Sequence, residues 1–225
     1  MHASTRLPLF PLDVVLFPGA PLPLHIFEPR YRQMLAEALD GERSIGMVPT
    51  GPDGRPPTGT IGCIGTIADA QMLADGRSNI VLSGQQRFVI RRYLVVERPF
   101  DVALVDEFAD EPGTEPEADD VETLRTLHRR HAELLGLVDS TPPAPPASPV
   151  PAIADDPELL SFQAASTLHT DPIKRRLLET RSTNERVQAL LLLLPSLIAT
   201  AESAASVQLR SQSNGKGGHH PDIIA

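Results

Sequence analysis

Several residue types that carry chemistry are scarce or missing in this sequence of 225 residues. Tryptophan is absent and aromatic residues make up 4%, so a core must be built mainly from aliphatic side chains. The single cysteine, Cys63, excludes an intramolecular disulfide and suits a reducing compartment. It lies in a predicted strand between glycines, which favours a small buried filler over a nucleophile. No GxSxG nucleophile motif is present.

Long uninterrupted apolar runs are also lacking. The N-terminal stretch has four prolines between Pro8 and Pro21, a poor match to the apolar core of a signal peptide. The most apolar stretch elsewhere, residues 187–201, contains Gln188 and Pro195 and is shorter than a membrane-spanning helix requires. We therefore expect a cytoplasmic protein with no membrane contact.

Basic residues are outnumbered, with 20 Lys and Arg against 29 Asp and Glu and a net charge of −9. Nucleic-acid phosphates repel an acidic protein, so nucleic-acid binding is not the expected function. A local basic cluster does exist, but strand alternation would place its members on two different faces. It consists of Arg87, Arg91, Arg92 and Arg98. Few aromatic residues are available for stacking on bases, which further disfavours RNA binding.

The first half of the sequence is patterned as strands. Proline is too frequent in residues 6–27 for a helix, and Leu22, Leu24 and Ile26 alternate along an extended segment. Further extended runs are predicted at 45–48, 61–72, 79–82, 87–96 and 100–108. Six or more short strands predict a β-barrel or sandwich.

One helix interrupts these strands. Pro29 suits the first helical position, where a missing N–H group costs nothing. Apolar residues then recur at helical spacing and make one face, which consists of Tyr31, Met34, Leu35, Ala38 and Leu39.

The second half is patterned as helices. Residues 109–119 are acidic and rich in proline and glycine, which predicts a linker after a β-rich domain over residues 1–108. From there the apolar period changes to 3.6, predicting a helical subdomain over residues 120–210. Helices are expected at about 157–168 and 172–180 and after Ser182, where Glu185 completes a capping-box spacing. Residues 140–151 are expected to form a proline-rich loop and residues 211–225 a disordered tail.

Three segments together resemble a known family. They are LPLFPLDVVLFPGAPLPLHIFEPRYRQML at 7–35, DGRSNIVLSGQQRFVI at 75–90 and TDPIKRRLLETRSTNERVQALLLLL at 170–194. All three are similar, in the same order, to the N-terminal substrate-binding domain of Lon proteases. The resemblance implies an α+β fold, a PUA-like β pseudo-barrel with a helical insert followed by an α-helical bundle. It also implies recognition of unfolded or tagged polypeptides, alongside a protease or chaperone.

The motifs of an active Lon enzyme are missing from this sequence. A P-loop needs Ser or Thr after Gly-Lys, and the only Gly-Lys pair, Gly215-Lys216, is followed by glycine. The peptidase dyad needs a lysine of lowered pKa in an apolar pocket. Lys174 lies in an arginine-rich helical stretch and Lys216 in the predicted tail. We therefore expect a non-catalytic binding module with no nucleotide, no metal and no other cofactor.

Four residues are candidates for contact with a partner. Glu28, Arg30 and Tyr31 belong to the EPRY motif, which is either a polypeptide- or ligand-contact site or simply the start of a helix. We favour the second interpretation, with Tyr31 in the core and Arg30 held by a nearby carboxylate or carbonyl. Arg87, which follows a predicted turn, is either a contact residue or an anchoring ion pair.

Two histidines are the remaining chemical candidates. His128 and His131 have the i, i+3 spacing that could share a metal ion, but no third ligand stands out nearby. We interpret them as part of an exposed basic face together with the adjacent arginines.

The leading hypothesis is a polypeptide-binding adaptor or chaperone-like module. It would use apolar surface between the barrel and the helices, or exposed strand edges that accept an added strand. Two alternatives stay open at this point, an RNA-binding PUA-like protein and an enzyme using carboxylates or His25 in a polar cleft.

Overall fold

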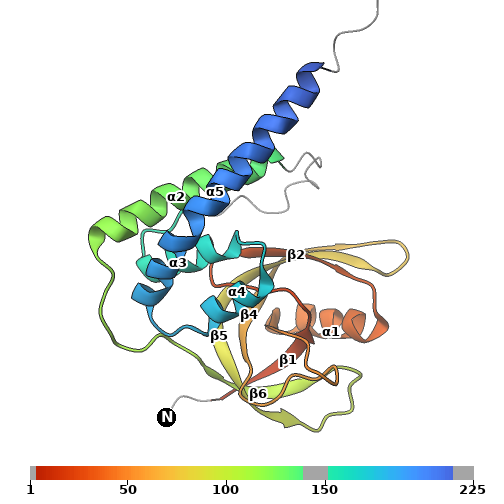
Figure 1. The fold of residues 1–225 in the computed structure, drawn as a ribbon. Helices are drawn as coiled ribbons and strands as arrows, with labels where there is room; N and C mark the ends of the chain where they lie inside the picture. Colours follow the sequence, from red (N-terminus) through yellow and green to blue (C-terminus); the bar gives the residue numbers. More distant parts are fainter. Residues whose placement is uncertain (1–3, 139–151, 215–225) are drawn as a thin grey trace, which may run out of the picture.

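The computed structural model describes residues 4–138 and 152–214, which form six strands and five helices (Figure 1). The strands are β1 (Thr5–Pro11), β2 (Pro21–Ile26), β3 (Ser44–Val48), β4 (Ile61–Met72), β5 (Ser78–Leu94) and β6 (Val102–Glu107). They follow the order β2-β5-β4-β3-β1-β6, and β6 also pairs with β5. Five strands therefore close into a barrel, while β2 is attached through β5. The pairing of β1 with β3 is parallel, and the other pairings are antiparallel.

The two parts of the long strand β5 pair with different strands. Its first part pairs with β2, from Ile26 opposite Ser78 to Pro21 opposite Ser83. Its second part pairs with β6, starting at Phe88 opposite Glu107. Between these parts the register with β4 shifts, which marks a β-bulge of the kind that re-aims side chains. The bulge carries Gln85 and Gln86, and it faces the helical part of the protein.

Helix α1 (Pro29–Asp40) closes one end of the barrel core. The apolar face predicted from spacing is confirmed, because Tyr31, Met34, Leu35 and Ala38 are buried. The Tyr31 ring lies 4.3 Å from the ring of Phe10 in β1, measured between centroids. These side chains join aliphatic residues of the strands in one core cluster.

The remaining helices are α2 (Ala118–Val138), α3 (Pro157–Ser166), α4 (Asp171–Glu179) and α5 (Thr183–Asn214). In Figure 1, α2 and α5 lie side by side, and α3 and α4 sit between them and the barrel. Two helices begin with a side-chain cap. Ser182 accepts from the Glu185 N–H at 3.2 Å, as the capping-box spacing predicts, and Asp156, which was not predicted as a cap, accepts from the Leu159 N–H at 2.8 Å. The result is the α+β fold expected from the sequence. The predicted loop 140–151 and the tail from residue 215 onward lie outside the described residues.

The helices share a core with one segment of the barrel. Phe17 and Ala20, between β1 and β2, are buried against apolar residues of α2, α3 and α5. The Phe17 and Phe162 rings lie 6.1 Å apart, measured between centroids. This packing fixes α3 against the barrel and so determines the geometry of the boundary between the two parts.

Helix α5 extends well beyond the apolar stretch at residues 187–201. It passes through Pro195 and runs to Asn214, beyond residue 210, the end predicted from the pattern. By length and composition alone, Thr183–Ser206 is long and apolar enough to cross a membrane, with a mean hydropathy of 1.6 over its most apolar window. Core helices of water-soluble proteins meet the same criterion, but only 17% of this window is buried within the protein. The helix therefore carries apolar surface that the other described residues leave uncovered.

Candidate functional site

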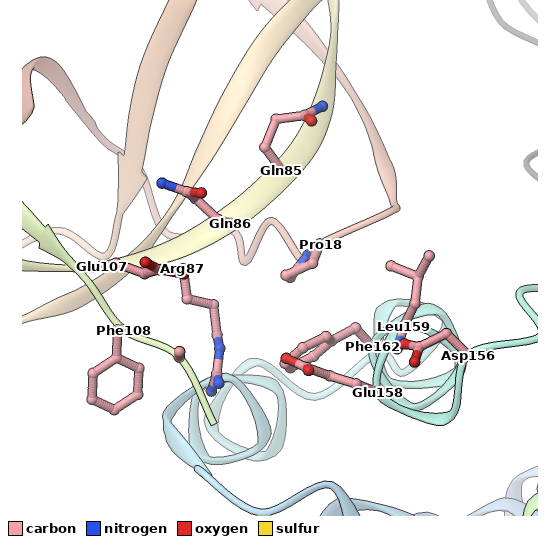
Figure 2. A pocket seen from close by; sticks show the side chains of 11 residues that line it. Pro18, Gln85, Gln86, Arg87, Glu107, Phe108, Asp156, Glu158, Leu159 and Phe162 are labelled. Carbon is pink, nitrogen blue, oxygen red and sulfur yellow. Dashed lines mark hydrogen bonds between the residues drawn. The ribbon is translucent and has the colours of Figure 1, made fainter. Parts of the chain in front are cut away.

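A cavity of about 460 Å³ lies where the barrel meets the helices. Figure 2 shows Gln85, Gln86 and Arg87 of β5 on one side and Glu158, Leu159 and Phe162 of α3 on the other. Pro18, Glu107, Phe108, Ala109 and Asp156 complete the lining. The cavity thus combines aromatic and aliphatic surface with amides and carboxylates.

Local backbone features bring these walls together. The β5 bulge presents two exposed amide side chains at the point where pairing passes from β2 to β6. Across the cavity, α3 approaches the loop before β2 at Gly19, whose φ is +70°. The positive φ favours glycine here, and a Cβ atom at this position would lie 2.5 Å from Leu159 Cδ1 and push that side chain aside.

Beneath the cavity, two buried arginines share one carboxylate. The side chains of Arg87 in β5 and Arg186 in α5 are 2% and 0% exposed, and both bind Asp110. Arg186 Nη1 and Nη2 donate to the two Asp110 oxygens at 2.8 and 2.7 Å. Arg87 Nη2 also donates to Asp110, and its Nη1 donates to the carbonyls of Leu178 and Thr180, each at 2.7 Å. One cluster therefore ties the barrel, the segment between the two parts and the helices together.

Aromatic rings and hydroxyl groups complete this cluster. The guanidinium groups of Arg87 and Arg186 lie 4.9 and 4.1 Å from the centroid of the Phe162 ring, within cation–π range. Thr183 donates to Asp110 at 2.8 Å, and Arg186 Nε donates to Ser161 at 2.9 Å. The buried charges are thus hydrogen-bonded as well as paired, the condition under which burial of ions is tolerated.

The surroundings shift the acid–base properties of the cluster. Burial lowers the pKa of Arg87, and the neighbouring charge of Arg186 lowers it further. Burial raises the pKa of Asp110, but hydrogen bonds from Arg186 and Thr183 and the charges of both arginines outweigh it, so the pKa falls. Burial and the charge of Asp110 raise the pKa of Glu158 in the cavity wall. The cavity therefore presents a carboxyl group that takes up a proton more readily than an ordinary surface glutamate.

The four candidate contact residues do not form one site. Glu28 and Arg30 lie at the start of α1, joined by an ion pair of 2.9 Å, and the Arg30 guanidinium lies 4.4 Å from the centroid of the Tyr31 ring. Tyr31 itself is in the barrel core. Arg87 is in the buried cluster, where it forms the anchoring ion pair that was one of its two predicted roles. Of these four residues, Glu28 and Arg30 have exposed side chains, at the start of α1.

Sequence reasoning missed the other two charged members of the buried cluster. Asp110 lies in the stretch interpreted as a solvated linker, and nothing in its local sequence marks it as buried. Arg186 did carry a signal, since it shares a helical phase with Leu190 and Leu194, both of which are buried. A charged residue in an apolar stripe needs a partner, and that requirement could have indicated an internal ion pair.

The predicted basic cluster is not one surface. Arg87 is buried, Arg91 pairs with Asp106 at 2.5 Å, and Arg98 pairs with Glu37 at 2.5 Å. His25, the candidate residue for an enzyme with a polar cleft, is exposed. Its ring nitrogen Nδ1 lies 2.7 Å from Asn79 Oδ1, and its side chain does not line the cavity between β5 and α3. Neither alternative function gains support from this geometry.

The interpretation of His128 and His131 as an exposed basic face is wrong. Both point into the bundle and are buried, while the adjacent Arg129 and Arg130 are exposed. Both histidines lie on the buried side of α2 that also holds Leu124. Burial lowers the pKa of His128 to about 4, with a further contribution from His131. Among residues 4–138 and 152–214, no three His, Cys, Asp or Glu side chains are grouped closely enough to hold a metal ion.

Two reactive side chains remain, and burial shifts the pKa of each. Cys63 is fully buried, as predicted, and burial raises the pKa of its thiol to about 12. Lys174 is more buried than its arginine-rich sequence suggests, and burial lowers its pKa. Within the part of the chain that the structure describes, no hydrogen bond joins its ammonium group to a serine hydroxyl.

Comparison with known proteins places this geometry in a family. A family model described as the ATP-dependent protease La (LON) substrate-binding domain matches residues 6–196. A Lon protease of Parabacteroides distasonis is 26% identical over 217 residues, which cover 91% of this chain and 25% of that protein. The chain thus spans about a quarter of the length of this curated relative.

Solved structures share the same fold. A Lon N-terminal domain protein from Xanthomonas campestris is similar with a TM-score of 0.62 and 25% identity, covering 84% of this chain and 98% of that one. The N-terminal domain of a Mycobacterium avium complex Lon protease has a TM-score of 0.60 and 20% identity, covering 85% and 98%. Because the family model spans most of the sequence and the solved neighbours share its α+β fold, this chain belongs to the LON substrate-binding domain family.

Proposed function

We propose that this protein is a non-catalytic module that binds unfolded or tagged polypeptides and acts as an adaptor or a chaperone-like holder. Membership of the substrate-binding domain family supports a polypeptide as the general kind of partner. The observation that carries the proposal is the cavity between β5 and α3, whose walls are held by the Arg87–Asp110–Arg186 cluster.

The cavity has the chemistry that an extended polypeptide requires. Leu159 and Phe108 offer apolar surface for a side chain, and the Gln85 and Gln86 amides can both donate to and accept from a peptide backbone. Glu158 adds a carboxyl group whose raised pKa lowers the cost of holding it next to apolar surface. Such a mixed lining suits many sequences, as a binder of unfolded chains requires.

Recognition by strand addition is less well supported. Among the described strands, β2 pairs with β5 alone, so its other edge is free. Pro21 and Pro23 in this strand have no N–H group to donate to an added strand. We therefore assign recognition to side chains of the cavity rather than to the edge of β2.

Two exposed apolar side chains lie away from the cavity, and we propose them as a second, separate contact point. Phe27, just after β2, is 59% exposed, and Met72, at the end of β4, is 63% exposed. Both lie next to the same part of the sheet, since Ile26 and Met72 are each paired with Ser78. Methionine and phenylalanine adapt to varied apolar partners, which fits unfolded segments of differing sequence.

Fluorescence anisotropy tests the proposal with a labelled protein that has been irreversibly unfolded by reduction and alkylation, compared with its folded form. We expect binding of the unfolded form that persists in high salt. Leu159→Arg and Gln86→Arg, on opposite walls, should each weaken binding about tenfold or more, the cost of a misplaced charge in a contact surface. Val95→Arg, at a fully exposed position outside the cavity, is the matched control. Equal binding by all three variants would refute the assignment of the site, and salt-sensitive binding of a structured RNA without polypeptide binding would refute the function.

A further inference from the structure

The charges that line the cavity between β5 and α3 are mostly of one sign. Its acidic side chains are Glu107 at the end of β6 and Asp156 and Glu158 at the start of α3. Arg87 is the basic residue in this lining, but its side chain is buried and already bound to Asp110. The surface that the cavity offers to a ligand is therefore negatively charged.

Glu158 lacks a partner of opposite charge. Figure 2 shows its carboxylate extending from α3 toward the β5 wall, and its side chain takes part in no hydrogen bond or ion pair within residues 4–138 and 152–214. Burial raises the pKa of this carboxyl group, and the negative charges of Asp110 and Asp156 add to the effect. A cation placed beside Glu158 would offset both the loss of water and the repulsion between the carboxylates.

The acidic surface continues beyond the cavity. A neighbouring hollow of about 190 Å³ shares Asp156 and Glu158 with the cavity and lies against the start of α5. Its lining also includes Asp110, Glu111, Glu115, Ser182 and Thr183. Because the two hollows adjoin at shared side chains, an extended segment can place an apolar group in the cavity and a charged or polar group toward the hollow.

A metal ion does not suit this arrangement. In the part of the chain that the structure describes, no three Asp, Glu, His or Cys side chains come close enough together to hold one. Carboxylates spread around a cavity of about 460 Å³ suit a larger organic cation, since cavities of this size take molecules or side chains. The guanidinium group of arginine fits best, because it is planar and offers several N–H donors to carboxylate oxygens.

We propose that this cavity selects polypeptide segments in which a basic side chain stands next to an apolar one. The inference rests on the proposed function and deepens it, because it adds a preference of charge to the binding of unfolded chains. The basic side chain meets Glu158, and its apolar neighbour packs against Leu159 and Phe108. Segments with a carboxylate in the same place are repelled, which gives selectivity by unfavourable contacts as well as by favourable ones.

Fluorescence anisotropy with three labelled peptides tests this preference. The peptides share one leucine- and phenylalanine-containing sequence and differ at a single position, which is arginine, citrulline or glutamate. Citrulline keeps the shape of arginine without its charge, and blocked ends remove the terminal charges. We expect the arginine peptide to bind about tenfold more tightly than the citrulline peptide, and the glutamate peptide to bind most weakly. In about 1 M salt the three affinities should approach one another while binding persists, because screening then acts over about 3 Å.

Variants of the protein connect the preference to the cavity. Glu158→Gln should reduce the preference for arginine over citrulline to about threefold or less, because it removes the charge and keeps the shape. Glu107→Gln, which changes the β6 side of the cavity, should also reduce it, so the result does not depend on one position. Glu97→Gln is the matched control, since it changes the net charge equally at an exposed residue that lines neither hollow.

The possible outcomes separate this inference from the proposed function. Equal affinities for the three peptides, or a preference that Glu158→Gln does not reduce, would overturn the inference and leave the proposed function in place. An equal loss of the arginine and citrulline peptides in Glu158→Gln would also overturn it, because the residue would then maintain the shape of the cavity without selecting charge. If neither the peptides nor an unfolded protein binds, the proposed function fails and the inference fails with it.

Discussion

Replacing Asp110 by alanine would leave two arginines buried without their counter-charge. The Arg186 and Arg87 side chains are 0% and 2% exposed and that of Asp110 is 14% exposed, so little water reaches the two guanidinium groups to replace the missing carboxylate. Breaking a buried ion pair by removing one partner costs about 3–5 kcal/mol. A domain of this kind has a free energy of unfolding of about 5–15 kcal/mol in total, so Asp110→Ala should remove a large share of it.

The neighbouring residue is a matched control. Glu111 also pairs with an arginine, Arg181, at 2.5 Å, but both side chains are well exposed. An exposed pair contributes about 0–1 kcal/mol, so Glu111→Ala should have little effect on the free energy of unfolding. Asp110→Asn, which keeps an acceptor but loses the charge, should fall between the two.

Urea unfolding followed by far-ultraviolet circular dichroism is the appropriate assay, because the chain has no tryptophan to report by fluorescence. The reasoning is refuted if Asp110→Ala and Glu111→Ala differ by less than about 1 kcal/mol, the ordinary scale of a surface change. The double variant Asp110→Ala with Arg186→Met should recover part of the loss, because it removes one of the two unpaired charges.

Three further predictions concern buried groups. The pKa of His128 is lowered from 6.5 to about 4, so the unfolded chain takes up a proton first, and stability should fall by about 3 kcal/mol as pH drops across this window. His128→Leu should reduce the change in urea midpoint between pH 7 and 5, and the part that remains is expected from His131, whose pKa burial also lowers. Cys63, buried and with a pKa of about 12, should react with a thiol reagent at least about 100-fold more slowly in the native protein than in guanidinium chloride. A Cβ atom at Gly84 would lie 1.9 Å from the Phe17 carbonyl oxygen, so Gly84→Ala should lower the free energy of unfolding by about 3 kcal/mol or more, and a calorimetric melt near that of the wild type would contradict this.

Features encoded by neighbouring residues could be predicted from the sequence. The apolar face of α1 and the capping of α5 follow from spacing over a few residues, and the structure has both. The separation of strands from helices follows from the change of period. The burial of Cys63 follows from its position in a strand between glycines.

Features that depend on tertiary contacts could not be predicted in the same way. Asp110 has the acidic, proline-rich surroundings of a solvated linker, and only the approach of β5 and α5 buries it. His128 and His131 are a different case, because the helical phase that they share with the buried Leu124 could have indicated their burial despite the adjacent arginines. The cavity itself requires the β5 bulge and α3 to meet, which residues far apart in the chain decide together.

The pairing of the first two strands has a consequence for how the chain is made. β1 pairs with β3 and β6, and β2 pairs with β5, so every partner of these strands lies later in the sequence. As synthesis proceeds from the N-terminus, both strands must wait unpaired while their apolar residues are accessible to other nascent chains. Five prolines fall between residues 8 and 23. Proline interrupts the continuous backbone hydrogen bonding on which aggregates grow. We therefore expect these prolines to protect the nascent chain from aggregation during synthesis, before the strands that pair with β1 and β2 have been made.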